Sequence, residues 1–221
     1  MLIWVTIVTL LLAFALIGRW FFSSPDQLGR RRRFPSIAVP VLLVVAAATG
    51  WVNYSHHRLE QELSAVATQL VGKTVSVHCQ SFGESFLDAG AEAGYVVFSA
   101  DGIPEPKTLI KRDTCNKLRA FRSSSGDAAP DAQVAAVHVL THEAMHMRGE
   151  ISEPAAECEA MQRNAVTARL LGAEPQAAVQ LARRYWVEIY PKMPSDYQSA
   201  DCGPGQRMDE SLPDAPWAKV Q

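Results

Sequence analysis

Two long uncharged stretches near the N-terminus constrain the fold of this chain more than any other feature. Residues 1–18 contain no charged side chain, and residues 35–52 form a second stretch of the same kind. Both approach the roughly 20 apolar residues that an α-helix needs to cross a bilayer. Aromatic residues, which favour membrane–water interfaces, lie near their ends: Trp4, Trp20, Phe34, Trp51 and Tyr54. The sequence therefore predicts two transmembrane helices and makes the lipid bilayer a partner.

The segment between these stretches predicts how the helices are oriented. It contains the basic run Arg30–Arg33, and short loops rich in arginine stay in the cytoplasm. A nucleic-acid-binding patch is the other use of such a run. The flanking apolar stretches and a net charge of -2 give no reason to expect nucleic acid. We therefore expect residues 1–54 to form a membrane hairpin with a cytoplasmic loop, and everything that follows to be extracytoplasmic.

The cysteines agree with an extracytoplasmic location. All four follow the second apolar stretch: Cys79, Cys115, Cys158 and Cys202. An even number of cysteines in an oxidising compartment indicates disulfides, and four cysteines allow three pairings. From their order and placement we expect Cys79 to pair with Cys115 and Cys158 with Cys202; four buried free thiols are the alternative. The sequence contains no C-x-x-C motif, so a zinc site built on cysteine is not expected.

Periodicity divides the rest of the chain into a connecting helix and an α+β domain. Residues 55–73 have apolar side chains at helical spacing and should form a helix that leads away from the membrane. Residues 74–221 form the predicted extracytoplasmic domain. Its first three segments are rich in β-branched and aromatic residues and predict a small antiparallel sheet: 74–79, 94–99 and 107–112. A helical core follows, with helices predicted over 113–122, 131–148, 153–171 and 175–190.

The helix predicted over residues 131–148 contains the sequence His-Glu-Ala-Met-His, which starts at His142. Positions i and i+4 lie on one face of a helix, so His142 and His146 can direct two imidazoles at one metal ion. Zinc lowers the pKa of a bound water toward neutrality, and Glu143 is placed to take its proton. The simpler interpretation is an amphipathic helix whose histidines only pack or form hydrogen bonds. His138 lies about 12 Å along the helix from His146, so we interpret it as a core or supporting residue.

A third protein ligand is needed, because catalytic zinc usually has three of them and a water. Ser152 is a good N-cap for the next helix, which carries Glu153 and Glu157 on one face at i and i+4. Both carboxylates are also explained by favourable charge placement near a helix N-terminus, worth about 0.3–1 kcal/mol. The residues alone therefore leave open which of the two binds metal.

The motif and its surroundings resemble the zincin metallopeptidases. Uncharged residues flank H-E-x-x-H, as in that group, although Arg148 departs from its pattern. Metzincins continue with a glycine, matched by Gly149, and with a third histidine, where this chain has Ser152. The pair Glu153 and Glu157 instead resembles the E-x-x-x-D motif of gluzincins, although the gap of six residues before it is short. That resemblance implies Glu153 as the third ligand and Glu157 as the support of a ligand histidine, with the reverse assignment as the alternative.

The zincin resemblance implies a membrane-anchored, zinc-dependent metallopeptidase-like protein that hydrolyses peptide bonds outside the cytoplasm. Zn²⁺ would be held by His142, His146 and Glu153, with Glu143 as the catalytic base on a zinc-bound water. In zincins an edge strand beside the metal-binding helix pairs with extended substrate, so a peptide or protein substrate is implied. A further hydrogen-bond donor is often a Tyr or His, which the sequence offers at three unranked positions: His138, Tyr190 and Tyr197.

The layout of residues 74–217 is also similar to that of a group of small extracytoplasmic actinobacterial membrane proteins. The shared order is Cys, strand, Cys, H-E-x-x-H, an E-x-x-x-E-C helix and a late Cys-Gly-Pro-Gly. This similarity concerns layout rather than activity, and a rival hypothesis comes from a different functional class. In it the domain binds zinc only for stability and acts as a non-catalytic extracytoplasmic binding or structural module. A closed site with both Glu153 and Glu157 on the metal would favour the module, whereas an open coordination position would favour the enzyme.

Overall fold

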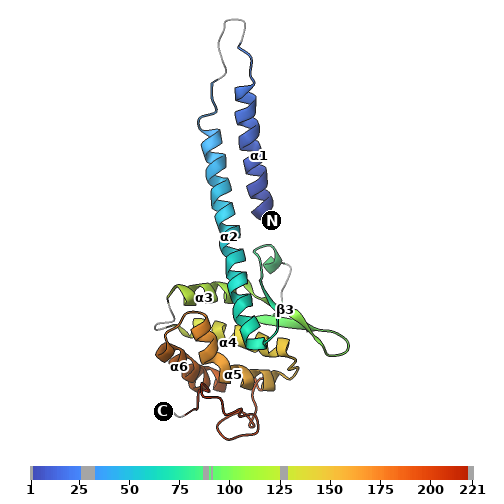
Figure 1. Ribbon diagram of the computed structural model, residues 1–221, viewed down its shortest axis with the longest axis vertical. Helices are drawn as coiled ribbons and strands as arrows, with labels where there is room; N and C mark the ends of the chain where they lie inside the picture. The colour runs from blue at the N-terminus through green and yellow to red at the C-terminus, as the bar shows by residue number, and fades with distance from the viewer. Residues whose placement is uncertain (1, 26–32, 87–89, 91, 125–128, 219–221) are drawn as a thin grey trace. The chain divides into compact units, whose positions relative to one another are not determined.

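Figure 1 shows the chain as a computed structural model, which describes residues 2–25, 33–86, 90, 92–124 and 129–218. The chain divides into two compact units, Met1–Arg58 and Leu59–Gln221. Of the basic run predicted to be cytoplasmic, Arg30–Arg33, only Arg33 lies within the described residues.

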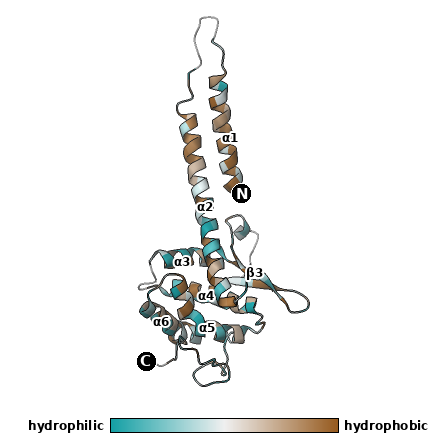
Figure 2. Ribbon diagram, viewed as in Figure 1, coloured by the Kyte–Doolittle hydropathy of each residue, from teal (hydrophilic) through white to brown (hydrophobic). Residues whose placement is uncertain are grey.

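The first unit contains α1 (Leu2–Phe21) and the beginning of α2 (Ala38–Val71). Both helices are long and apolar enough to cross a membrane, which confirms two candidate spans by length and composition (Figure 2). Between them, the hydroxyl groups of Thr6 and Thr49 form a hydrogen bond of 2.7 Å. Small residues let two helices approach closely in hydrocarbon, and a hydroxyl pair adds a hydrogen bond between them.

The second apolar stretch and the predicted connecting helix form one continuous helix, α2. No Pro or Gly interrupts its sequence between Gly50 and Gly72. From Leu59 onward α2 belongs to the second unit, where Leu59, Leu63 and Val66 are buried at helical spacing. Gly72 has a φ of 78°, the left-handed conformation in which glycine commonly follows the last turn of a helix. The last part of α2 therefore contributes to the core of the second unit.

The second unit contains a three-stranded mixed sheet in the order β1-β3-β2. Its strands are β1 (Ser76–Cys79), β2 (Gly94–Phe98) and β3 (Pro104–Ile110). A short turn joins β2 to β3, which are antiparallel, but β1 pairs with β3 in parallel. The prediction of an antiparallel sheet is therefore wrong for β1. Alternating side chains indicate the two faces of a strand but not its partner, and β1 reaches β3 through the long connection that parallel strands require.

Four helices follow the sheet, as predicted: α3 (Arg112–Ser123), α4 (Asp131–Arg148), α5 (Glu153–Leu170) and α6 (Pro175–Arg184). α6 continues into a π-helical turn, Tyr185–Ile189, and a 3-10 turn, Tyr190–Lys192. α4 packs against α3, α5 and the strands β2 and β3, and most of its residues are buried. The unit is therefore α+β and mostly helical, with the H-E-x-x-H helix at the centre of its core.

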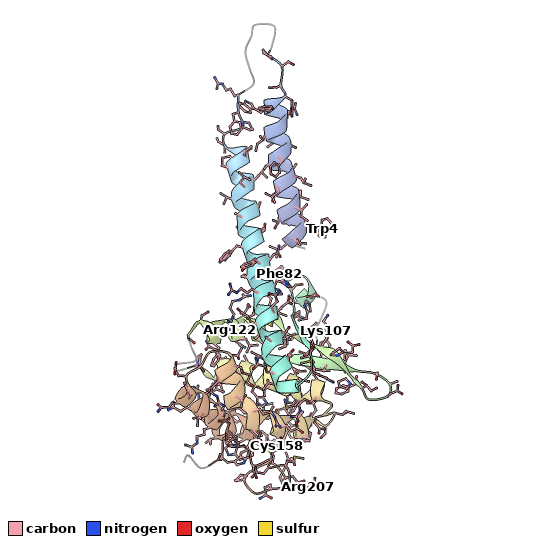
Figure 3. The ribbon with its side chains drawn as sticks, viewed as in Figure 1. Trp4, Phe82, Lys107, Arg122, Cys158 and Arg207 are labelled. Atoms are coloured by element: carbon pink, nitrogen blue, oxygen red, sulfur yellow. A yellow bond between two sulfur atoms is a disulfide. The ribbon has the colours of Figure 1, made fainter. Side chains whose placement is uncertain are left out.

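Both predicted disulfides are confirmed. Cys79–Cys115 joins β1 to α3. Cys158, labelled in Figure 3, is bonded to Cys202 and joins α5 to the irregular C-terminal tail. Side chains of α5 also hold the tail through hydrogen bonds: Gln162 with Met208 and Glu210, Arg163 with Glu210, and Arg169 with Asp214. The tail is thus attached along α5, the helix that carries both glutamates of the predicted site.

Candidate metal centre

A very short turn between α4 and α5 brings the predicted ligands together. α4 ends at Gly149, whose φ of 121° favours glycine, and the Gly149 N–H donates to the carbonyl oxygen of His146. The Glu150 N–H donates to the carbonyl oxygen of Met145 in the same turn. The chain then enters α5 at Glu153. A gap of six residues is therefore enough to place the start of α5 beside the end of α4.

Three atoms converge beside this turn: His142 Nε2, His146 Nε2 and Glu153 Oε2. The two nitrogens lie 2.9 Å apart, and the oxygen lies 3.0 Å from His142 Nε2 and 3.5 Å from His146 Nε2. Tetrahedral ligands at zinc distances of about 2.0–2.2 Å are separated by roughly 3.3–3.6 Å. The three atoms are thus close to the spacing of three ligands on one ion. Both histidines are buried and Glu153 is half-buried.

The outer nitrogens of both imidazoles are engaged, which orients the inner ones. His146 Nδ1 lies 2.6 Å from the carbonyl oxygen of Glu150, and His142 Nδ1 lies 3.1 Å from Glu157 Oε2. Carbonyl and carboxylate oxygens only accept hydrogen bonds, so both Nδ1 atoms carry protons. Each Nε2 then directs an electron pair toward the same point as Glu153 Oε2. Such a cluster needs positive charge at its centre, either a metal ion or a proton on one imidazole.

A proton on His142 meets this need when no metal is bound. Burial lowers the pKa of His142, but hydrogen bonds to Glu153 and Glu157 outweigh it and raise that pKa to about 9. Burial, followed by the charge of His142, lowers the pKa of His146. The hydrogen bond to His142 lowers the pKa of Glu153. At neutral pH the cluster therefore contains one proton in the place where a cation would bind.

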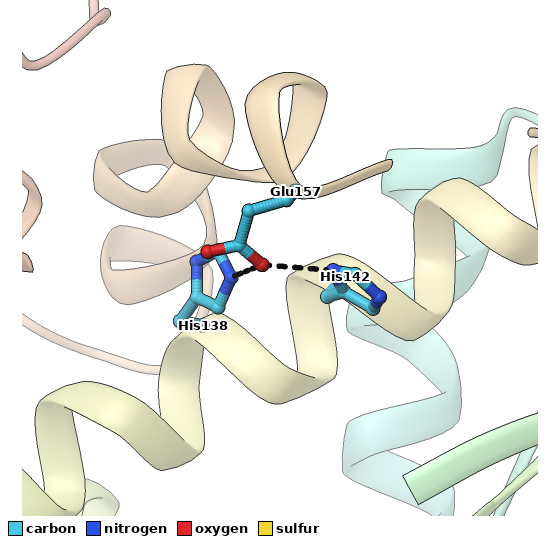
Figure 4. Close-up of side chains that lie close together, drawn as sticks. All are labelled: His138, His142 and Glu157. Atoms are coloured by element: carbon cyan, nitrogen blue, oxygen red, sulfur yellow. Dashed lines mark hydrogen bonds and ion pairs between the residues drawn. The ribbon is translucent and has the colours of Figure 1, made fainter. Parts of the chain in front are cut away.

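Glu157 supports His142 from the side opposite this cluster. Figure 4 shows its carboxylate between two imidazoles, with Oε2 2.8 Å from His138 Nε2 and 3.1 Å from His142 Nδ1. The hydroxyl of Tyr185 donates to Glu157 Oε1 at 2.7 Å. Burial opposes the charge of Glu157, but His138 and His142 hold the pKa of its carboxyl well below the usual range. This buried carboxylate therefore accepts hydrogen bonds from three side chains.

Two overlapping groups in the described part of the chain can hold a metal ion: His142, His146 and Glu153, and His138, His142 and Glu157. The donor atoms of each group lie within 4.8 Å of one another. All members of the second group are buried, whereas the first includes the half-buried Glu153. The fold thus contains a His/Glu cluster that can bind a metal ion.

Glu143 is buried beside the cluster and belongs to neither group. Thr108 Oγ1 lies 3.4 Å from Glu143 Oε2 but 2.9 Å from the carbonyl oxygen of Tyr95, which is the better acceptor for its single proton. The backbone of Gly94 covers Glu143 so closely that a Cβ there would lie 3.1 Å from both Cγ and Oε1. Burial raises the pKa of Glu143 to about 7. A carboxyl group with this pKa can both take and return a proton near neutrality.

Sequence reasoning did not identify Gly94 and Thr108 beside Glu143, or Tyr185 beside Glu157. Gly94 gave a weak signal, because an isolated glycine in a strand often marks a close approach of the backbone. Thr108 has no feature that separates it from other β-branched strand residues. Tyr185 belongs to a helical pattern in which it reads as an ordinary core residue. Their roles depend on tertiary contacts alone.

A cavity of about 500 Å³ adjoins the His/Glu cluster. Pockets for small ligands typically measure about 300–1,000 Å³. Apolar and aromatic residues of α4, β2 and the segment after α6 form much of its wall: Val96, Phe98, Val139, Ile189, Met193 and Tyr197. Aromatic rings flank the two histidines, with Phe98 6.0 Å from His146 and Tyr197 5.9 Å from His142 between ring centres. The cluster is therefore reachable by a ligand.

The three candidates for a further hydrogen-bond donor differ in what they already bind. The hydroxyl of Tyr190 accepts from the Ser199 N–H at 3.0 Å. His138 lies between Glu157 and Asn164. Tyr197 lines the cavity, and its hydroxyl has no hydrogen-bond partner among the described residues. Burial raises the pKa of Tyr197, so its hydroxyl remains a donor at neutral pH.

Comparisons with protein-family models, with curated proteins and with solved structures find no match for this chain.

Proposed function

We propose that this chain is a membrane-anchored, zinc-dependent metallopeptidase-like protein that hydrolyses peptide bonds outside the cytoplasm. The observation that carries the proposal is the convergence of His142 Nε2, His146 Nε2 and Glu153 Oε2 at 2.9–3.5 Å beside a cavity. Two imidazoles and one carboxylate form a ligand set that suits zinc. Three protein ligands leave one position for water or substrate, as a catalytic zinc requires.

The remaining polar groups supply the proton chemistry of peptide hydrolysis. Zinc, when bound, supplies a Lewis acid that polarises a carbonyl and lowers the pKa of water. Glu143 accepts the proton of the attacking water and passes it to the leaving amine, and its burial, which raises the pKa of its carboxyl group in the metal-free chain, favours its taking up that proton. Gly94 and Thr108 confine the carboxyl group and keep it buried. Glu143 is thus proposed as the catalytic acid–base.

Tyr197 is the best placed of the three candidate donors for the developing oxyanion. It lines the cavity with its ring centre 5.9 Å from that of His142, and its hydroxyl, unlike the polar groups of His138 and Tyr190, has no hydrogen-bond partner in the described part of the chain. A preorganised donor of this kind contributes by stabilising charge that appears only in the transition state.

β2 offers a way to bind an extended peptide. It is an edge strand in the order β1-β3-β2, and it lines the cavity with Gly94, Tyr95, Val96 and Phe98. An edge strand presents unpaired backbone N–H and C=O groups, to which a peptide can add as a further strand. A peptide bound in this way would lie alongside the metal cluster and close to Glu143.

Location supports a substrate outside the cytoplasm. Two helices are long and apolar enough to span a membrane, and the second unit carries two disulfides, which form in oxidising compartments. The basic run Arg30–Arg33 favours a cytoplasmic loop between the helices. Together these features support an extracytoplasmic location for residues 74–221.

Metal content and activity of the full chain in detergent test the proposal. We expect about one zinc per chain in the wild type, and little in His142→Ala, because a ligand is lost. Glu143→Gln should keep its zinc and lose hydrolysis of a casein substrate, whereas the exposed Glu188→Gln serves as the matched control. Peptidase activity that persists in Glu143→Gln contradicts its role, and a zinc-free wild type contradicts the metal site.

The buried group His138, His142 and Glu157 favours the non-catalytic module as the second candidate. A metal ion held there would be enclosed by protein and would serve stability alone. X-ray absorption on the zinc-loaded chain separates the two: the peptidase requires a bound water, and the module requires a closed set of protein ligands.

A further inference from the structure

We infer that His138, Asn164 and Tyr185 are positioning residues. By holding Glu157 in place they fix the tautomer of His142 and leave its Nε2 available to bind metal. This inference rests on the proposed metal site at His142, His146 and Glu153. It assigns a role to three buried polar side chains that neither bind the metal nor touch the cavity's reacting centre in the proposed mechanism.

Three elements contribute to this network, all of them in the core. His138 lies on α4 one turn before His142, Asn164 lies on α5, and Tyr185 follows α6. All are at most 3% exposed, as is Glu157. Burying polar groups is costly unless each is hydrogen-bonded. Four such groups packed together beside a ligand histidine therefore indicate more than space filling.

The positions of the protons in this network follow from which of its groups can only accept hydrogen bonds. Glu157 only accepts, so His138 Nε2 and the Tyr185 hydroxyl must donate to it, at 2.8 and 2.7 Å. His138 Nδ1 is then free to accept, and the Asn164 Nδ2 amide donates to it at 3.0 Å. If the Asn164 amide were reversed, its oxygen would face His138 Nδ1 and would require a proton there. A neutral His138 would then have no proton on Nε2, and the electron pair of Nε2 would face the Glu157 carboxylate. Asn164 thus matches the tautomer that Glu157 imposes on His138, while its own Oδ1 is buried without a partner in the described part of the chain.

The same logic extends to the metal ligand. Glu157 Oε2 is shared between His138 Nε2 and His142 Nδ1. Because His138 and Tyr185 hold the carboxylate from two other directions, it keeps its place opposite His142 Nδ1. That nitrogen therefore carries the proton, and His142 Nε2 is left to bind metal. Orienting carboxylates of this kind typically contribute about 10–100-fold to metal affinity.

The ring of His138 stacks on the ring of Tyr185, which helps to hold both side chains in position. Their ring centres lie 3.7 Å apart with an angle of 15° between the rings. Each ring therefore limits the rotation of the other while both contact Glu157.

A metal ion bound to His138, His142 and Glu157 would replace the protons that both histidines donate to Glu157. The complete set of hydrogen bonds around the carboxylate instead accounts for the group without a second ion.

Variants that remove one contact at a time test the inference in the full chain in detergent. His138→Leu removes the donor to Glu157, and Tyr185→Phe keeps the ring stack but removes one hydroxyl. His138→Gln restores a donor near the position of Nε2. Thr167→Val is the matched control, because it removes a buried α4–α5 hydrogen bond of 2.8 Å to Thr141 that does not touch Glu157.

Zn²⁺ affinity by chelator competition and the visible absorption of bound Co²⁺ are the readouts, with thermal unfolding as the measure of folding. We expect His138→Leu to weaken Zn²⁺ binding about 10–100-fold and to alter the Co²⁺ spectrum. Tyr185→Phe should weaken it by a smaller factor, and His138→Gln should recover most of the loss. Thr167→Val should lower the unfolding temperature without changing either metal readout.

Two results overturn the inference while leaving the proposed function intact: wild-type affinity in both His138→Leu and Tyr185→Phe, or two ions per wild-type chain with one lost in His138→Leu. If His138→Leu fails to fold, Tyr185→Phe alone decides, and unchanged affinity in it overturns the inference. Absence of metal binding in the wild type instead overturns the proposed function itself.

Discussion

Replacing Gly94 by alanine should separate catalysis from metal binding. A Cβ at this position would lie 3.1 Å from Glu143 Cγ and Oε1 and 3.2 Å from Cδ, closer than nine in ten of the contacts that real Cβ atoms make. Glu143 is buried, so its side chain can yield only by a few tenths of an ångström within a packed core. The methyl group should therefore move the carboxyl group proposed as the catalytic base while leaving His142 and His146 untouched.

The size of the effect follows from the sensitivity of catalysis to position. A displacement of about 1 Å can cost about 100-fold in rate, so a few tenths of an ångström should cost roughly 3–10-fold in kcat. Stability should change little, because alanine in a strand gains roughly 0.5–1 kcal/mol over glycine and the crowding offsets that gain. Zinc affinity should stay at the wild-type value, since Glu143 is not a ligand.

Steady-state peptidase kinetics and zinc titration of Gly94→Ala provide the measurement, with Val97→Ala on the exposed face of the same strand as control. The double variant with Glu143→Asp sharpens the test. The shorter side chain withdraws from the new methyl group, so Gly94→Ala should cost less in that background. Full kcat in Gly94→Ala, or an identical cost in both backgrounds, would refute the proposed contact between Gly94 and the catalytic base.

Three further predictions concern the same domain. Tyr197→Phe should retain zinc and lower kcat by roughly 100-fold, because it removes a donor to the developing oxyanion; unchanged kcat would exclude that role. The raised pKa of His142 stabilises the metal-free fold below pH 6.5, and this contribution is lost as pH rises through about 9. Zinc binding at pH 7 should therefore release about one proton, measured by calorimetry in buffers of different ionisation enthalpy. Replacing Cys158 and Cys202 by serine should cost about 2–4 kcal/mol of unfolding free energy for a loop of 44 residues, while zinc affinity changes less than about threefold.

Local sequence relations predicted more of this molecule than distant ones. His142 and His146 are separated by one helical turn, and the i, i+4 rule is enough to place them together. The cysteines paired in the expected order. The direction of β1 was predicted wrongly, because a strand pattern does not specify which neighbour it meets. Predictions therefore succeeded where the geometry of one element, or the order of the chain, decides the contact.

The surroundings of the candidate site required tertiary placement. Thr108 meets Glu143 across 35 positions of sequence, and Asn164 meets His138 across 26. Nothing in a strand threonine or a helical asparagine identifies such a partner. His138 was interpreted as a core or supporting residue, and its contact with Glu157 gives that support a definite form. The chemistry of a ligand is thus visible in its residue type, whereas the chemistry of its support depends on the fold.

The short turn between α4 and α5 explains how so small a domain can hold a three-ligand site. The carbonyl group of Glu150 lies inside the turn and accepts a hydrogen bond from His146 Nδ1. Glu157 follows Glu153 by one helical turn and accepts a hydrogen bond from His142 Nδ1. The three proposed ligands and the groups that contact their Nδ1 atoms directly therefore lie within 16 consecutive residues, 142–157, of two packed helices. The sheet adds the groups that cover Glu143, namely Gly94 and Thr108. If the proposed function is right, metal binding should consequently tolerate changes in the sheet that abolish hydrolysis, because separate parts of the fold hold the proposed ligands and the proposed base.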